Sequence, residues 1–254
     1  MNAPRDSNSQ QPLKNLQAKY HELAELAGSL AHEIKNPLSV IRMNMDLLAE
    51  DLDEAETPRE RRVLGKIDVV HTQCTRLENL LNDFLKFTRL QQLNLLAGNL
   101  NQVVDRVLDL FRVQAAESQV EVRRYLDPDL PTILIDAETL ESAIVNLVKN
   151  AIESMPDGGT LTATTRLTKN AIALDLIDTG CGMGEQTALN MFDAFYTTKN
   201  GGSGLGLPTA RKVVEAHGGR ISVQSVEGRG TKFTLEFPAP ARISSTPEDS
   251  LAAK

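Results

Sequence analysis

The residues best suited to group-transfer chemistry lie in the run 29–37, Ser-Leu-Ala-His-Glu-Ile-Lys-Asn-Pro. His32 is a titratable nucleophile in a strongly helical segment, with Glu33 beside it and Asn36 one turn later. Residues four apart share a helix face, so His32 and Asn36 are expected to point the same way. Pro37 lacks an N–H and its ring crowds the Glu33 carbonyl, which predicts a kink just past the histidine. A lone helical histidine is more often a surface or core residue than a reactive one, so its role depends on the rest of the chain.

A second candidate site contains two asparagines four residues apart, Asn146 and Asn150. Two amides on one polar helix face can offer a carbonyl oxygen to Mg²⁺, here assigned to Asn146, and N–H donors to phosphate. Apolar residues at helical spacing would line the opposite, buried side: Leu140, Ile144, Leu147 and Ala151. The alternative is an ordinary solvated helix face.

Asp178 directly follows an apolar strand and precedes the glycines Gly180 and Gly182. A carboxylate at a strand end, beside glycines that let a ligand approach the backbone, is suited to accept a hydrogen bond from a purine amino group. The alternative is a simple turn.

The segment 201–207, Gly-Gly-Ser-Gly-Leu-Gly-Leu, fits neither of two common phosphate-binding patterns. It has Leu207 where the dinucleotide fingerprint needs a third glycine, and Leu-Pro where a P-loop needs Lys-Ser/Thr. We interpret it as a flexible lid that opens onto a helix N-terminus suited to phosphate. Upstream, the aromatic residues of 192–199 pack locally or dock on a helical bundle, and Lys199 would neutralise a terminal phosphate. The lid residues expected to contact a nucleotide are Gly202, Gly204, Leu205 and Gly206.

Composition limits the classes to which the protein can belong. The 254 residues, 41% hydrophobic and 24% charged, suffice for one large domain or two modest ones. A net charge of −7 argues against a nucleic-acid-binding surface. Cys74 and Cys181 lie far apart and the four histidines form no paired motif, so we expect neither a His/Cys metal site nor a disulfide framework. No apolar run reaches the ~18 residues needed to span a bilayer and no signal peptide is recognisable, which predicts a soluble, cytoplasmic protein.

The N-terminal part of the chain predicts two long helices with heptad seams. A polar segment, residues 1–15, is expected to be disordered, and Thr57-Pro58 marks a break between the helices. Two antiparallel helices cannot bury both stripes alone, so we expect a homodimer with a four-helix bundle; the competing explanation is a hairpin packed on its own domain. The first seam is Ile34, Leu38, Ile41, Met45, Leu48 and Leu52, and the second is Val63, Ile67, Val70, Cys74, Leu77, Leu81 and Phe84.

The rest of the chain predicts an α/β two-layer sandwich. Periodicity and turn signals place helices over 101–117, 137–155 and 207–217. They place strands over 120–126, 132–135, 160–167, 171–177, 220–226 and 231–237.

Each motif is weak alone, but their order is specific: asparagine helix, Asp-Gly strand end, aromatic stretch, glycine lid, and Gly-Arg-Gly-Thr at 228–231. In this order they resemble the ATP-binding domain of two-component sensor histidine kinases, the Bergerat-type fold shared with certain chaperones and topoisomerases. Residues 32–37 resemble the phospho-acceptor box of the same family. The resemblance covers roughly residues 18 to 238 and is strongest to the nitrogen-regulation-type branch. The chain departs from the family at Glu153, where many members have a lysine, and at Ala194, where a proline is common.

The resemblance implies a protein histidine kinase, a phosphotransferase of two-component signalling. ATP with Mg²⁺ would lie against Asn146 and Asn150 beneath the lid, with adenine on Asp178 and further contacts at Gly180, Gly182 and Thr231. His32 would attack the γ-phosphorus, Glu33 would fix the tautomer of its ring, and Asn36 would position water for dephosphorylating the partner. The phosphoryl group would pass to an aspartate on the receiver domain of a response regulator, toward which the protein would also show phosphatase activity.

The expected domains are a dimerisation and histidine-phosphotransfer hairpin over 16–93, an ATP-binding domain over 94–238 and a disordered tail over 239–254. The alternative function is a phosphatase-dominant or catalytically idle ATP-binding adaptor, which autophosphorylation of the purified protein would separate from a kinase. A chaperone-type ATPase or a serine kinase is less favoured, because neither needs the His-Glu-x-x-Asn-Pro box. The sequence does not indicate the input signal, the cognate regulator or the balance between kinase and phosphatase activity. It also does not indicate whether the chain is a truncation without its sensor. Whether phosphorylation occurs within a protomer or across the dimer depends on the loop near Thr57.

Overall fold

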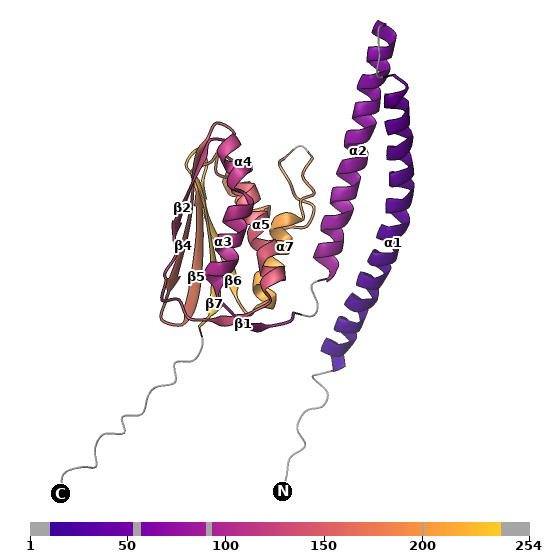
Figure 1. Ribbon diagram of the computed structural model, residues 1–254. Helices are drawn as coiled ribbons and strands as arrows, with labels where there is room; N and C mark the ends of the chain where they lie inside the picture. Colours follow the sequence, from indigo (N-terminus) through magenta and orange to yellow (C-terminus); the bar gives the residue numbers. More distant parts are fainter. Residues whose placement is uncertain (1–10, 53–56, 90–92, 200, 240–254) are drawn as a thin grey trace, which may run out of the picture. The chain divides into compact units, whose positions relative to one another are not determined.

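The computed structural model describes residues 11–52, 57–89, 93–199 and 201–239, and these form two compact units. Of the described residues, the first unit contains those up to residue 89 together with those of the segment 185–212. The second contains residues 93–184 and 213–239. Figure 1 shows the helical hairpin of the first unit and the sheet of the second.

The hairpin consists of α1 (Gln11–Glu50) and α2 (Pro58–Arg89). α1 begins at Gln11, so residues 11–15, expected to be disordered, are helical; Pro12 suits the first turn, where an N–H has no partner. The helix continues unbroken through Pro37, and its axis curves along its length (Figure 1). Residues 1–10 and 240–254, also expected to be disordered, lie outside the described residues.

A capping box fixes where α2 begins. The Thr57 hydroxyl accepts the backbone N–H of Glu60 at 3.2 Å, and the Glu60 carboxylate accepts the N–H of Thr57 at 2.9 Å. Pro58 is the first helical residue, a position where its missing N–H has no cost. The expected break at Thr57-Pro58 is therefore confirmed.

The two predicted seams divide into a buried and an exposed set within the hairpin. Alternate members are buried: Leu38, Ile67, Cys74 and Leu81 are 4–8% exposed. Cys74 is thus a small core residue, as expected. Three further members, Met45, Leu52 and Phe84, are half-buried. The remaining six are 37–50% exposed in the single chain: Ile34, Ile41, Leu48, Val63, Val70 and Leu77.

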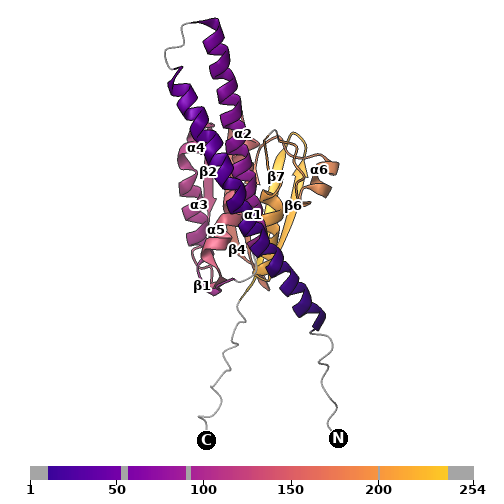
Figure 2. The same cartoon turned by 90° about the vertical axis from the view of Figure 1, so that its right-hand side faces the viewer.

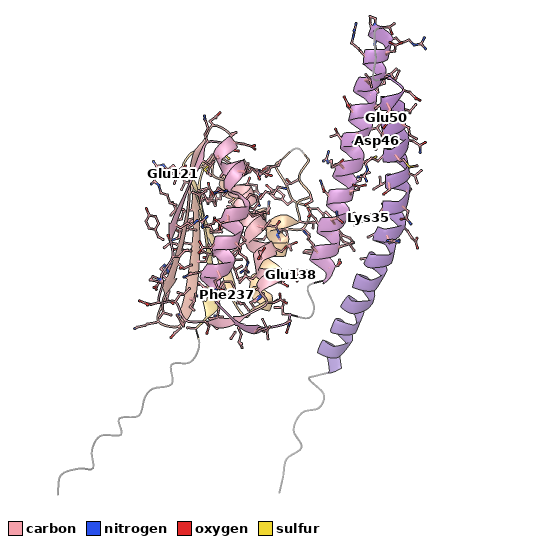
Figure 3. All side chains as sticks on the ribbon, in the orientation of Figure 1. Lys35, Asp46, Glu50, Glu121, Glu138 and Phe237 are labelled. Atoms are coloured by element: carbon pink, nitrogen blue, oxygen red, sulfur yellow. The ribbon has the colours of Figure 1, made fainter. Side chains whose placement is uncertain are left out.

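Two polar pairs tie the helices together and set their antiparallel register. Arg42 Nη1 lies 3.1 Å from Glu78 Oε2, and His71 Nε2 lies 2.7 Å from Asp46 Oδ1. Asp46 is labelled in Figure 3, near the end of α1. The first unit also contains α6 (Glu185–Asn190), which the sequence did not predict, and most of α7 (Gly206–Ala216).

A five-stranded sheet in the order β2-β4-β5-β7-β6 forms the second unit. β2 and β4 run parallel and the other neighbours run antiparallel. Parallel neighbours need a crossover, which β3 (Ile133–Ile135) and α5 (Ala137–Glu153) provide. β3 also pairs with β1 (Leu96–Gly98) in a separate two-stranded ribbon that the sequence did not predict. The sheet strands are β2 (Val120–Tyr125), β4 (Gly159–Leu167), β5 (Ala171–Asp178), β6 (Arg220–Val226) and β7 (Gly230–Pro238).

Helices cover one face of this sheet and leave the other open (Figures 1 and 2). α3 (Leu100–Leu110), α5 and the end of α7 lie on the covered face, with α4 (Arg112–Glu117) following α3. The predicted helix 101–117 is divided at Phe111, whose backbone leaves the helical region at φ −88° and ψ 2° while its ring is buried. The predicted two-layer α/β architecture is confirmed. None of the helices among the described residues is both long and apolar enough to cross a membrane.

Candidate active site

His32 lies on the solvent side of α1, next to residues that pack inside the hairpin. Its neighbour Ala31 is 1% exposed, whereas His32, Glu33 and Asn36 are all exposed. Within the described part of the chain, neither ring nitrogen of His32 is hydrogen-bonded, to Glu33 or to any other group. The imidazole is therefore accessible, and the tautomer-fixing role of Glu33 stays a prediction.

α5 carries the two asparagines on the side away from its buried stripe. Leu140, Ile144 and Leu147 are at most 1% exposed, while Asn146 and Asn150 are half-buried. Asp136 caps the helix, because its Oδ1 accepts the N–H of Thr139 at 3.0 Å. The predicted core side of this helix is confirmed, and both amides lie at its boundary.

Asp178 is the buried carboxylate at the end of β5 and is 5% exposed. Its Oδ1 accepts the backbone N–H of Gly180 at 2.9 Å and that of Thr231 at 3.1 Å, and the Ser154 hydroxyl lies 3.4 Å from the same oxygen. Among the described residues, all side-chain hydrogen bonds of Asp178 are made by Oδ1. The second oxygen is thus available to a donor on a ligand.

Burial raises the pKa of Asp178 above its ordinary value, and the hydrogen bonds from Gly180 and Thr231 counter this only in part. The ionised carboxylate is therefore held in place at a cost in folding free energy. A buried carboxylate with a raised pKa and an oxygen left for a ligand is typical of a functional site.

The glycines after Asp178 are needed for chain packing. A Cβ on Gly180 would lie 2.0 Å from the Ser154 hydroxyl oxygen, and one on Gly182 would lie 2.1 Å from the Val226 carbonyl oxygen. Gly182 also has φ +64°, which favours glycine. These contacts show that the glycines let the turn pack on α5 and on the end of β6. The expected approach of a ligand to their backbone stays a prediction.

The lid residues differ in what they can offer a ligand. Leu205 is completely buried, so its side chain belongs to the core. Gly204 has φ +67° and its Cβ would meet the Phe195 backbone at 2.5 Å, while Phe195 donates its N–H to the Gly204 carbonyl at 3.0 Å. Gly202 donates to the Lys199 carbonyl, and exposed Lys199 lies in the same turn. The lid is therefore held by specific backbone contacts.

Ser203 anchors the lid within the first unit. Its hydroxyl donates to Asp83 Oδ2 at 2.6 Å and accepts the N–H of Leu205 at 3.3 Å, just before α7 begins at Gly206. Phe195 has a left-handed backbone (φ +68°) and is 57% exposed, an unusual combination for an aromatic residue. Phe192 packs locally, with the Arg211 guanidinium 5.4 Å from its ring centre.

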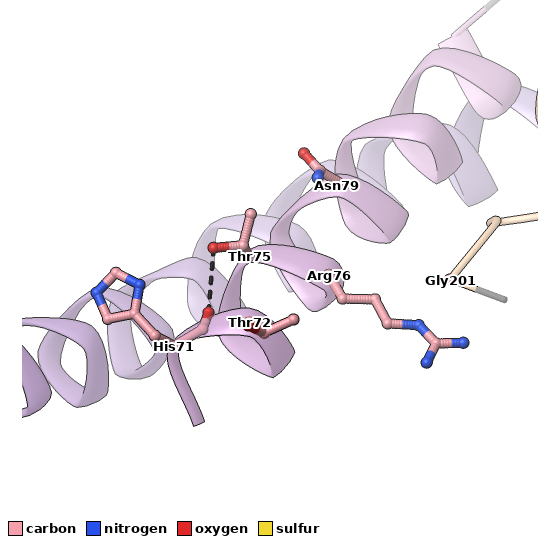
Figure 4. A pocket seen from close by; sticks show the side chains of 6 residues that line it. All are labelled: His71, Thr72, Thr75, Arg76, Asn79 and Gly201. Atoms are coloured by element: carbon pink, nitrogen blue, oxygen red, sulfur yellow. Dashed lines mark hydrogen bonds between the residues drawn. The ribbon is translucent and has the colours of Figure 1, made fainter. Parts of the chain in front are cut away.

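A shallow hollow on α2, also in the first unit, contains none of the predicted site residues (Figure 4). Arg76 extends toward Gly201, and the Thr75 hydroxyl donates to the His71 carbonyl at 3.1 Å. The hollow is lined by His71, Thr72, Thr75, Arg76, Asn79 and Gly201.

The structure brings together part of the predicted site. Asp178, Gly180 and Thr231 form one hydrogen-bonded cluster in the second unit. Asn146 and Asn150 belong to the same unit. His32, Lys199 and the lid residues belong to the first unit. The sequence reasoning missed Ser154, which contacts Asp178, and Ser225, whose hydroxyl lies 2.9 Å from that of Thr231 and accepts the Met183 N–H. Both serines are separated in sequence from Asp178, so no local pattern indicates them.

Comparison with known protein families assigns both halves of the chain. Residues 22–93 match the family described as His Kinase A (phospho-acceptor) domain. Residues 135–241 match the family described as histidine kinase-, DNA gyrase B-, and HSP90-like ATPase. The first range contains His32 and the second contains the asparagine helix, Asp178 and the lid.

Two curated relatives illustrate the similarity. The chain is 33% identical over 219 residues to sporulation kinase E of Bacillus subtilis (strain 168), which covers 86% of this chain and 29% of the relative. It is 32% identical over 216 residues to sensor histidine kinase ZraS of Escherichia coli (strain K12), which covers 85% of this chain and 45% of the relative. The chain thus spans less than half the length of these relatives.

Solved structures share the fold. Full-length ShkA in complex with AMPPNP matches with a TM-score of 0.68 and 27% identity, over 84% of this chain and 45% of that one. The histidine kinase ThkA in complex with the response regulator protein TrrA matches with a TM-score of 0.64 and 23% identity, over 93% of this chain and 68% of that one.

Proposed function

Because the chain belongs to the sensor histidine kinase family, we propose that it phosphorylates His32 with ATP and passes the phosphoryl group to an aspartate of a response regulator. The observation that carries the proposal is the state of Asp178, a buried carboxylate with one oxygen bonded to Gly180 and Thr231 and the other left for a donor. The amino group of adenine is such a donor. ShkA, a relative of the same fold, was solved with the ATP analogue AMPPNP.

The residues present fit a Mg²⁺–nucleotide complex. Half-buried Asn146 offers a side-chain oxygen of the kind that Mg²⁺ prefers, and Mg²⁺ is usually bound by few protein ligands together with substrate phosphates. When bound, Mg²⁺ would neutralise charge on the phosphates, while Asn150 would donate to them and Lys199 would add a positive charge.

His32 supplies the nucleophile in this proposal. A ring nitrogen lone pair forms the N–P bond, the bond from the γ-phosphorus to the bridging oxygen breaks, and ADP leaves. Exposure of the imidazole on α1 supports this role, because the ring must meet a nucleotide carried by another part of the protein. Asn36, one turn later, is exposed to solvent. In this proposal its amide would orient water for dephosphorylating the regulator, which would add phosphatase activity.

The partners follow from the same features. The exposed seam on α1 and α2 supports a homodimer in which a second hairpin completes a four-helix bundle. ThkA, a protein of the same fold, was solved with a response regulator protein, which is the class of partner that we propose. The expected loop residues 53–56 lie outside the described residues, so transfer within or across protomers stays open.

The test is autophosphorylation of the purified full chain with γ-labelled ATP. We expect a label that is lost in acid and that falls to background in His32→Gln, because a phosphohistidine is acid-labile. His32→Gln should bind ATP like the wild type, whereas Asn150→Ala should lose both label and nucleotide binding. Equal labelling of His32→Gln would refute the assignment of His32. A wild-type protein that binds ATP without taking label would favour the adaptor.

A further inference from the structure

One carboxylate outside the predicted site joins the segment that enters the second unit to the helix that carries Asn146 and Asn150. Asp136 Oδ1 caps α5 by accepting the N–H of Thr139 at 3.0 Å. Its other oxygen, Oδ2, accepts the backbone N–H of Asn94 at 2.9 Å. Asn94 belongs to the incoming segment, residues 93–95, which follows the hairpin in sequence and leads into β1. The two oxygens of one side chain therefore hold the start of α5 and the incoming segment together.

The backbone of Asp136 is bonded in turn to the end of α7. The N–H of Asp136 donates to His217 Nε2 at 3.0 Å, and His217 Nδ1 lies 2.7 Å from the Val213 carbonyl. His217 is 7% exposed and meets the ring of Phe237 edge to face, with 6.3 Å between ring centres. Because Nε2 accepts, Nδ1 carries the proton and donates to Val213. Figure 3 labels Glu138, in the first turn of α5, and Phe237, near the end of β7.

These contacts also act on the Asp136 carboxylate. The N–H of Thr139, and after it that of Asn94, hold the pKa of Asp136 below its ordinary value despite partial burial. The carboxylate is therefore charged at neutral pH and accepts with both oxygens. An amide side chain of the same size has one acceptor oxygen only.

We propose that Asp136 is a positioning residue for phosphoryl transfer, which sets the incoming segment rigidly against α5 and the end of α7. This inference rests on the proposed function. A nucleotide held by α5 must meet His32, and the chain that follows α2 enters the nucleotide-binding unit at the incoming segment. Freedom in that segment spreads the nucleotide over more orientations and lowers the fraction that can react.

The decisive variant is Asp136→Asn in the full chain. Asn caps helices about as well as Asp, so the α5 cap survives, but the acceptor for the Asn94 N–H is lost. We expect autophosphorylation to slow about fivefold, with an ATP dissociation constant within about twofold of the wild type because Asn146, Asn150 and Asp178 are untouched. Asn99→Ala is the matched control: it removes the cap of α3, in which Asn99 Oδ1 accepts the N–H of Asn101 at 2.8 Å, without touching the incoming segment.

A second variant removes the same bond from its other end. Asn94→Pro deletes the donor and leaves Asp136 intact, so the double variant with Asp136→Asn should be no slower than the slower single variant. Hydrogen exchange on protein labelled with [15N]asparagine gives a readout besides activity. The Asn94 amide should exchange about tenfold faster in Asp136→Asn, while the Asn99 amide, visible in the same spectrum, should not change.

Three results would overturn the proposal. The first is that Asp136→Asn autophosphorylates at the wild-type rate or faster, and the second is that Asn99→Ala slows autophosphorylation as much as Asp136→Asn does. The third is that the Asn94 amide exchanges its hydrogen at the same rate in Asp136→Asn as in the wild type. Loss of the proposed function is distinguishable from these results. A wild-type protein that takes no label would refute the proposed kinase activity. The hydrogen-exchange rates of the Asn94 amide in the wild type and in Asp136→Asn would still decide whether Asp136 holds the incoming segment.

Discussion

At the scale of single residues, Asp178 combines a cost to folding with a gain for recognition. Burial raises the pKa of its carboxyl group, and one of its oxygens, Oδ1, accepts hydrogen bonds from two backbone N–H groups and a hydroxyl. A group whose folded pKa is raised favours folding at low pH, and this contribution is lost as pH rises through the folded pKa. At neutral pH the ionised Asp178 therefore lowers the stability of the unit that contains it.

We predict that Asp178→Asn weakens ATP binding by about a hundredfold, about 2.7 kcal/mol, because it places a donor where adenine needs an acceptor. The same change should leave the free energy of unfolding at pH 7 equal or higher, because it removes a buried charge. The stability difference, variant minus wild type, should shrink as pH falls toward the ordinary carboxyl range near 4.

Calorimetry with ATP and urea unfolding without nucleotide would measure the two effects. The chain has no tryptophan, so circular dichroism is the suitable probe of unfolding. A variant that binds ATP normally, or a stability difference that does not depend on pH, would contradict this account of Asp178.

At the scale of elements, the turn after β5 is held between α5 and the β6–β7 turn. Cys181 donates its N–H to the Ser154 carbonyl at 3.0 Å, and the Cys181 carbonyl accepts the N–H of Gly228 at 2.7 Å. The Met183 N–H donates to the Ser225 hydroxyl at 2.9 Å. Two regions distant in sequence, the end of α5 and the end of β6 with its following turn, thus fix the backbone next to Asp178.

We predict that Gly182→Ala destabilises the second unit by about 2 kcal/mol or more. Gly182 combines a left-handed φ with a Cβ position 2.1 Å from the Val226 carbonyl oxygen. Gly228→Ala is the matched control, because Gly228 also has a left-handed φ (+74°) but open space around its Cβ position. Gly228→Ala should lower the free energy of unfolding by only about 1 kcal/mol, because the left-handed backbone conformation is unfavourable for alanine but no steric contact is added. Urea unfolding compares the two, and equal losses of stability would show that the packing contact has no effect.

At the scale of the whole molecule, the hairpin leaves half of its seam uncovered. The exposed seam members recur every seven residues on both helices, at Ile34, Ile41 and Leu48 and at Val63, Val70 and Leu77. Apolar side chains at this spacing on two antiparallel helices are suited to a second hairpin packed as in a four-helix bundle. The same surface supports the proposed homodimer.

We predict that Ile41→Lys combined with Val70→Lys converts the proposed dimer to a monomer, because charged side chains would be buried at the centre of the bundle. Thr72→Lys is the control, since position 72 is exposed and lies on the opposite side of α2 from Val70. Sedimentation equilibrium of the full chain measures the change. A wild-type monomer, or a double variant that stays dimeric, would show that this seam is not the interface.

Sequence alone determined most of the elements and the family to which they belong. Apolar residues at helical and heptad spacing define the buried side of α5 and the hairpin seams, and alternation defines β4, β6 and β7, because these periods depend only on local backbone geometry. β5 is instead buried at consecutive positions from Ile172 to Leu176, as the central strand of the sheet. The phospho-acceptor box and the ordered glycine motifs identified the histidine kinase family. The particular branch stays a prediction.

Tertiary structure decided what depends on contacts between distant segments. β1 is three residues long and exists because it pairs with β3, and α3 ends where the Phe111 ring is buried. Ser154 reaches Asp178, and Asp136 reaches Asn94 and His217, across separations that no sequence period records. The sequence also did not show that the glycines after Asp178 pack against Ser154 and Val226. Local spacing encodes helices, strands and motifs, whereas a hydrogen bond between distant residues exists only once the chain has folded.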